Sequence, residues 1–340
     1  MLEPLLDSRL IFVTGKGGVG KSTVTAGLAR ALARRGRRTL VLETDTFSAM
    51  EDLFDYESPG LEPVAINENL HASNLESEEC FIATLRRFVP SERIARAVIK
   101  NRIARVFFQA APSVNEVTIL DQVRAFFEKR DDRGRTFYDH ILVDLPASGH
   151  AVTFLNVPET MHGMMRGIGP IATMSRQVAD LIADPKTTSI VAVCLPEEMP
   201  VNETIELADE IEKTLGRPLD MAIANMVHQP PIDSGDRPVF EQLHRRVRRE
   251  HPDVESLFFD NDADKEDSTA IARLVEGNAL AIGWADRDRE YLNLLYDKLS
   301  APIVEVPIMY ESSGADIVDE MGKLFLDGPT SRASSSSATA

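Results

Sequence analysis

The sequence predicts an α/β fold, with helices on both faces of a doubly wound, mostly parallel β-sheet. Apolar runs of strand length alternate with stretches of helical periodicity, which is typical of parallel strands joined by crossover helices. A glycine-rich loop after the first apolar run leads directly into a helical stretch. With 340 residues, 43% of them hydrophobic, the chain is long enough to bury a sizeable core.

The first predicted strand covers residues 10–13 and leads through the glycine-rich loop into the first helix. Apolar residues from Val24 to Leu32 recur at helical spacing, and the Arg-Arg-Gly stretch at 34–36 is typical of a helix end. A strand, a tight loop and a helix in this order form the context that a phosphate-binding loop requires.

The loop from Gly15 to Thr23 fits the phosphate-binding pattern G-x-x-x-x-G-K-[ST]. Glycines allow successive backbone N–H groups to point at one anion, and the following helix adds the positive end of its dipole. We expect Lys21 to contact the β- and γ-phosphates of ATP, and the Ser22 hydroxyl to bind Mg²⁺. The predicted nucleotide-binding residues of the loop are Gly15, Gly17, Gly18, Val19, Gly20, Lys21, Ser22 and Thr23.

Lys16 is a second lysine inside the same loop. The stretch from Lys16 to Thr23 resembles the deviant phosphate loop of the MinD, ParA, nitrogenase iron-protein and ArsA-like ATPases. In that group this lysine reaches the nucleotide of the partner subunit, so the resemblance implies a nucleotide-gated dimer. The alternative is a solvated loop lysine without a functional contact.

The second predicted strand, residues 39–42, ends just before an acidic stretch. An acid at the carboxyl end of a parallel strand faces the ligand of an open α/β sheet. The stretch from Thr44 to Ser48 resembles the switch I of ArsA-like proteins, which implies that Asp45 positions the attacking water. The alternative is that Asp45 caps the helix that follows.

Residues from about 67 to 130 have mostly helical periodicity and are punctuated by Pro90 and Pro112, so we predict a helical insertion at about 67–135. Within it, the segment from Ala110 to Glu116 resembles one that ArsA-like proteins place near the nucleotide across the dimer.

The apolar run that ends at Asp144 predicts a strand with a Walker B acid, which reaches Mg²⁺ through water. The continuation to His150 resembles the Asp-x-x-x-[ST]-Gly-His switch II of ArsA-like proteins. The resemblance implies that the Gly149 N–H meets the γ-phosphate and that His150 orients the switch; a structural role is the alternative for His150.

Segment 161–174 is rich in methionine and glycine. Tail-anchored-protein targeting ATPases, which are relatives of ArsA, hold a client helix in a methionine-rich groove here. The segment looks short for a long groove helix, which favours core or dimer packing, and both alternatives stay open.

Three further strands are predicted at residues 189–193, 221–225 and 303–307, with a helix ending at Gly216 after the first of them. By the same resemblance, Asn225 reads the adenine and the segment from Pro307 forms the adenine-side loop.

Composition limits the possible partners. The formal net charge of −17 disfavours a nucleic-acid surface, and no apolar run approaches the length of a membrane span. The basic run at 245–249 is expected to be a solvated helix face. The two cysteines, Cys80 and Cys194, are far apart, which fits a reducing cytoplasm and excludes a C-x-x-C metal clip.

The sequence therefore predicts one ArsA-like ATPase domain over residues 1–327, an acidic loop at 253–267 and a disordered tail at 328–340. The predicted function is an ATP-hydrolysing dimeric switch, with Lys16, Lys21 and Asp45 as catalytic residues and ATP and Mg²⁺ bound. We expect a homodimer or a heterodimer with a paralogue, an unidentified protein client, no nucleic acid and no stable membrane insertion. The alternative function is a non-catalytic, nucleotide-dependent assembly or positioning module of the ParA or MinD kind, or half of a heterodimer.

Overall fold

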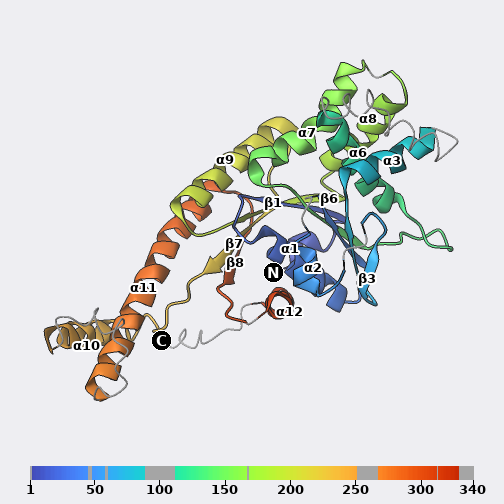
Figure 1. The fold of residues 1–340 in the computed structure, drawn as a ribbon. Helices are drawn as coiled ribbons and strands as arrows, with labels where there is room; N and C mark the ends of the chain where they lie inside the picture. Colours follow the sequence, from blue (N-terminus) through green and yellow to red (C-terminus); the bar gives the residue numbers. More distant parts are fainter. Residues whose placement is uncertain are drawn as a thin grey trace, which may run out of the picture.

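The fold is an eight-stranded sheet covered by helices on both faces (Figure 1). The computed structural model describes residues 2–44, 48–57, 60–88, 112–166, 168–250, 267–311 and 313–328. The strand order is β3-β4-β2-β5-β1-β6-β7-β8, and every pairing is parallel except that between β3 and β4. The predicted α/β architecture with a mostly parallel, doubly wound sheet is therefore confirmed.

The strands are β1 (Leu10–Gly15), β2 (Thr39–Glu43), β3 (Val64–Asn67), β4 (Leu70–Asn74), β5 (His140–Asp144), β6 (Thr188–Cys194), β7 (Met221–Val227) and β8 (Ile303–Pro307). The described helices are a 3₁₀ turn (Glu3–Leu5), α1 (Lys21–Arg34), α2 (Met50–Phe54), α3 (Ser77–Phe88), α6 (Pro112–Glu128), α7 (Ser148–Met164), α8 (Pro170–Ala183), α9 (Glu198–Leu215), α10 (Arg237–Glu250), α11 (Asp267–Lys298) and α12 (Gly314–Asp327).

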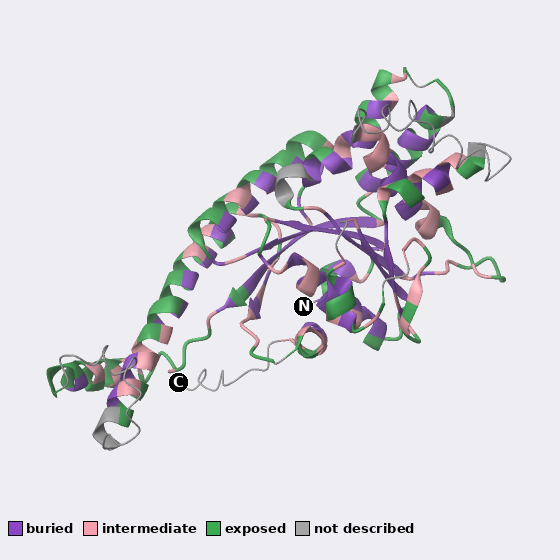
Figure 2. Cartoon of the chain, viewed as in Figure 1, coloured by how far each residue is buried: buried purple, intermediate pink, exposed green. Residues whose placement is uncertain are grey.

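Alternate side chains of the buried strands point to opposite faces and build two separate apolar clusters. In β1, Ile11 and Val13 pack with α1, α2 and α12, whereas Leu10 and Phe12 pack with α3, α6, α7, α8 and α9. The strands are accordingly buried between two helical layers (Figure 2). This two-sided burial explains why the strands appear in the sequence as continuous apolar runs.

The helical insertion begins later than the predicted residue 67. Strands β3 and β4 occupy this region, and the first helix after them starts at Ser77. The prediction was wrong because β4 contains His71, Ser73 and Asn74, so its apolar pattern is weak, and because β3 is the antiparallel edge strand. Residues 89–111, with Pro90 and Ala110, lie outside the described residues.

Helix α11 extends away from the sheet and carries α10 at its far end (Figure 1). The basic run was predicted as a solvated face, but Arg248 and His244 on α10 both bind the buried Glu276 on α11. The pKa of Glu276 is lowered, chiefly by its hydrogen bond from Arg248. The run thus contributes an anchor between the two helices as well as exposed charge.

Among the described helices, none combines the length and the apolar character needed to span a bilayer.

Two predicted segments lie almost entirely outside the residues that the structure describes. The predicted acidic loop lies outside the described residues except for Asp267, and so does the tail from residue 329 onward.

Candidate active site at the glycine-rich loop

The glycine-rich loop joins β1 to α1 at the carboxyl edge of the sheet. Its strand lies between β5 and β6, and the paired residues Val13 and Asp144 end up beside each other. Ligands of open α/β sheets bind at this edge. The fold therefore brings the loop and the Walker B candidate together although they are far apart in the sequence.

Two glycines of the loop are required by close packing. A Cβ on Gly15 would lie 2.4 Å from the Val193 carbonyl oxygen, and one on Gly20 would lie 2.4 Å from Asn225 Nδ2. Gly20 also has a left-handed φ of 80°, and Gly18 has a φ of 88° with no neighbour in reach of a Cβ. Such left-handed turns ahead of a helix N-terminus fit the cradle that a phosphate needs.

Lys21 and Ser22 converge on one carboxylate. Lys21 Nζ donates to Asp144 Oδ1 at 2.6 Å, and Ser22 Oγ donates to Asp144 Oδ2 at 2.6 Å. Thr25 Oγ1 donates to the Lys21 carbonyl oxygen at 2.9 Å. The side chains of Lys21 and Asp144 are only 9% and 6% exposed, so water weakens their interaction little.

This group of side chains fits both a phosphate and a divalent cation. Lys21 supplies a positive charge at the start of α1, where the helix dipole also favours an anion. The Ser22 hydroxyl and the Asp144 carboxylate supply the oxygen ligands that Mg²⁺ prefers. Thr23 lies in the same first turn of α1.

The end of β2 is held against Asp144 from the neighbouring strand. Thr44 Oγ1 donates to the Asp144 main-chain oxygen at 2.8 Å, and Glu43 is the register partner of Asp144. The Glu43 carboxylate accepts hydrogen bonds from Ser48 Oγ at 2.5 Å and from the Ala49 N–H at 2.8 Å. Burial raises the pKa of Glu43, and the negative charge of Asp144 raises it further.

Sequence analysis did not select Glu43, although its position at a strand end beside Asp45 was an available signal. Asp45 itself lies outside the described residues. The residues on either side of segment 45–47 are nevertheless fixed, because Thr44 is bonded to Asp144 and Ser48 to Glu43.

Asn225 and Pro307 reach the same edge from β7 and β8. Asn225 Nδ2 donates to the Val19 carbonyl oxygen at 2.9 Å, which ties the end of β7 to the loop. Pro307 ends β8 and is the register partner of Val227. Met226, the residue after Asn225, has a left-handed φ of 57° and a side chain that is 45% exposed. The structure ties Asn225 to the loop and places Pro307 on the neighbouring strand at the same edge of the sheet, and their role in reading the base stays a prediction.

Lys16 points to a different partner from Lys21. Its Nζ donates to Glu203 Oε1 on α9 at 2.5 Å, with the two side chains 36% and 35% exposed. The two loop lysines are therefore each paired with a carboxylate, one pair buried and the other partly solvated.

The start of α7 lies beside the loop. A Cβ on Gly17 would be 3.9 Å from the Cβ of Ala147, the residue at the N-cap position of α7. Gly149 falls in the first turn of this helix, so its backbone is near the loop, and its contact with a γ-phosphate stays a prediction. The His150 side chain lies outside what the structure describes.

The methionine-rich segment forms the end of α7, the turn after it and the start of α8, and both helices are short for a long groove helix. Met161 and Met174 are buried together with Val117 and Val157. Met164 is 75% exposed. The segment thus combines core packing with exposed apolar side chains, since Ile168 and Ile171 are also exposed.

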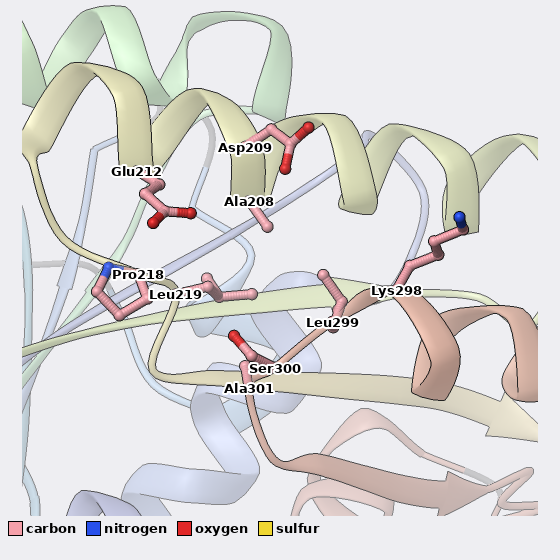
Figure 3. A pocket seen from close by; sticks show the side chains of 9 residues that line it. All are labelled: Ala208, Asp209, Glu212, Pro218, Leu219, Lys298, Leu299, Ser300 and Ala301. Atoms are coloured by element: carbon pink, nitrogen blue, oxygen red, sulfur yellow. The ribbon is translucent and has the colours of Figure 1, made fainter.

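The pocket shown in Figure 3 is separate from the loop. It holds about 60 Å³ and lies between the second half of α9 and the segment that follows α11. Its residues Leu219 and Ala301 directly precede β7 and β8, which places it at the amino edge of the sheet, opposite the loop. Elsewhere within the described ranges, no group of three or more histidine, cysteine or acidic side chains could hold a metal ion.

A family of known proteins matches the part of the chain that contains the loop and Asp144. The family of anion-transporting ATPases of the ArsA type matches residues 8–179. The chain is 31% identical over 235 residues to ATPase BagA of Mycobacterium tuberculosis, covering 66% of this chain and 68% of that protein. It is 27% identical over 260 residues to ATPase ASNA1 homolog 1 of Paramecium tetraurelia, covering 62% of this chain and 75% of that protein.

Proposed function

This chain belongs to the ArsA family of anion-transporting ATPases, and from that premise we propose that it is an ATP-hydrolysing dimeric switch coupled to a protein partner. The observation that carries the proposal is that Lys21 and Ser22 both donate hydrogen bonds to the buried Asp144. They follow a loop in which Gly18 and Gly20 have left-handed φ angles. Nucleotide binding is expected of the family, and its relatives are named ATPases.

In the proposed reaction the loop N–H groups and Lys21 hold the β- and γ-phosphates of ATP, and the Gly149 N–H contacts the γ-phosphate. Ser22 would bind Mg²⁺ and Asp144 would hold it through water; the ion would supply positive charge next to the phosphates. Asp45 orients the attacking water. Asn225 and the segment from Pro307 contact the adenine.

The site favours catalysis because its charges are fixed before the substrate arrives. The ammonium of Lys21 is buried beside Asp144, so its charge acts where water screens it little. Lys16 completes the site of the partner subunit, which makes dimer closure depend on ATP.

A protein client or partner is the second part of the proposal. The exposed side chains of Met164 and Ile168, 75% and 78% accessible, give α7 and the turn after it an apolar surface for such a contact. We place the protein in the cytoplasm because both of its cysteines are free and buried.

Lys21→Ala tests the nucleotide site. Removing the buried ammonium deletes a charge-assisted phosphate contact, so we expect calorimetry to show loss of ATP binding and a phosphate-release assay to show loss of turnover. Lys213→Ala, at an exposed position near the end of α9, is the control for the loss of one lysine. Unchanged ATP affinity and turnover in Lys21→Ala would refute the phosphate-loop interpretation.

The phosphate-release assay also distinguishes the ATPase from the alternative function, a non-catalytic nucleotide-dependent assembly module. Wild-type protein that binds ATP in the presence of Mg²⁺ but releases no phosphate would favour this alternative. Release of phosphate that depends on Lys21 would favour the ATPase.

A further inference from the structure

The ion pair between Lys16 and Glu203 results from the way α9 leaves the sheet. Strand β6 pairs with β1 up to Gly15, where Val193 is the register partner. Helix α9 begins at Glu198, a few residues after β6 ends, so its second turn passes the glycine-rich loop. Glu203 in that turn accepts a hydrogen bond from Lys16 Nζ at 2.5 Å.

The two lysine pairs of the loop differ in how easily they separate. The Lys21–Asp144 pair is almost fully buried, and breaking it would leave an uncompensated charge away from water. The Lys16–Glu203 pair is about one-third exposed on both sides, and such pairs are worth at most about 1 kcal/mol. Water can replace either partner, so an incoming anion can take Lys16 from Glu203.

We propose that Glu203 is a positioning residue that competes with nucleotide phosphate for the Lys16 ammonium. Glu203 holds Lys16 on α9, and Lys16 reaches a phosphate group only by leaving this carboxylate. The inference rests on the proposed function, because it takes ATP as the source of the phosphate. It applies whether that phosphate belongs to the same subunit or to the partner.

The competition has a definite sign. A carboxylate next to the loop lowers the affinity for an anionic ligand twice: it neutralises Lys16, and it repels the phosphates directly. Removing its charge while keeping its shape therefore strengthens nucleotide binding. A residue that merely supports the fold would have the opposite effect or none.

Glu203→Gln is the test variant, and the same helix offers a matched control. Glu206 lies three residues further along α9 and is exposed, so Glu206→Gln makes the same change in charge at a neighbouring position. Both substitutions are introduced into the wild type and into Lys16→Ala. The affinity for a non-hydrolysable ATP analogue with Mg²⁺ is measured by calorimetry at low and high salt, and thermal unfolding is recorded for each variant.

We expect Glu203→Gln to tighten binding of the analogue by roughly two- to fivefold at low salt, since exposed pairs contribute up to about 1 kcal/mol. The gain should shrink at high salt. In Lys16→Ala, Glu203→Gln should have a smaller effect than in the wild type, because the group for which Glu203 competes is gone and only its direct repulsion of the phosphates remains.

Weaker binding in Glu203→Gln, or an equal effect with and without Lys16, would overturn the role of Glu203. The failure of the proposed function looks different, because wild-type protein would then bind no analogue. Gln retains a carbonyl oxygen that can accept from Lys16, so Glu203→Ala is measured as a second variant. It should tighten binding at least as much, and a loss of affinity in it at an unchanged unfolding temperature would count against the proposal.

Discussion

At the scale of single residues, Asp144 is the side chain on which the site converges. Its two carboxylate oxygens accept from Lys21 and Ser22, and its main-chain oxygen accepts from Thr44. One residue therefore links the phosphate loop, the cation ligand and the start of the stretch that carries Asp45. A change at Asp144 would affect all three, whereas Asp45 can be tested with the anchor intact.

Asp45→Asn should preserve ATP binding and slow hydrolysis by roughly 10²–10⁴-fold, the usual contribution of a group that orients or deprotonates a nucleophile. Asparagine keeps the shape of the side chain but accepts no proton. Single-turnover phosphate release and analogue affinity are measured in parallel. Hydrolysis at the wild-type rate would remove Asp45 from the mechanism.

The burial of the two thiols predicts that the protein does not respond to arsenite or zinc. Cys80 and Cys194 lie in different apolar clusters, and burial raises the pKa of each to about 12. Cysteine binds zinc and arsenite as the thiolate, and this raised pKa disfavours the thiolate near neutral pH. We expect neither stoichiometric zinc after chelator washing nor stimulation of ATPase activity by arsenite. Elemental analysis of the washed protein and the phosphate-release assay with arsenite check this, and stoichiometric zinc would contradict it.

Spacing in the sequence selected three side chains that the structure brings together, and their roles toward a nucleotide stay predictions. Lys21, Ser22 and Asp144 were selected from their motifs, and the structure brings all three within hydrogen-bond distance. Glu203 was not selected as a partner of Lys16, because 187 positions separate the two residues and no local pattern connects them. Only the neighbouring positions of β1 and β6 bring them together.

At the scale of elements, the loop between β1 and α1 depends on glycines for two different reasons. Gly18 and Gly20 both have left-handed φ angles, 88° and 80°. A Cβ would meet nothing at Gly18 but would lie 2.4 Å from Asn225 Nδ2 at Gly20. Substitutions at the two positions can therefore separate the energetic cost of backbone strain from the cost of crowding.

Gly18→Ala should lower the free energy of unfolding by about 1 kcal/mol, the cost of a left-handed alanine. Gly20→Ala should cost about 1–3 kcal/mol more, because the methyl group must push Asn225 away from Val19. Urea denaturation of both variants measures the difference. Equal losses would show that the contact between Asn225 and the loop contributes no crowding.

The elements that the sequence predicted well are those with apolar residues on both faces. Six of the eight strands fall within a few residues of their predicted positions. Strands β3 and β4 were missed because polar residues interrupt them, and the helical periodicity of the following segment was extended over them. The helix that ends at Gly216 was predicted correctly because its glycine, with a φ of 68°, supplies a left-handed stop.

At the scale of the whole molecule, the proposed dimeric switch requires two copies of the site to act together. Lys21 is paired with Asp144 and Lys16 with Glu203 on α9, and the proposal assigns Lys21 to the phosphates of its own subunit and Lys16 to those of the partner. The sequence pointed to this division of roles through the resemblance of its second loop lysine. Light scattering with and without a non-hydrolysable ATP analogue should show association that depends on the nucleotide.

The most direct test of the dimeric switch mixes two inactive variants, Lys16→Ala and Asp45→Asn, after dissociation and reassociation. In a mixed dimer, the Lys16→Ala subunit keeps its own Asp45 and receives Lys16 from its partner, so one site is complete. Statistical mixing in a two-fold dimer should then restore roughly a quarter of wild-type ATPase activity. No recovery, despite subunit exchange demonstrated with differently labelled variants, would contradict the role of Lys16 in the partner's site.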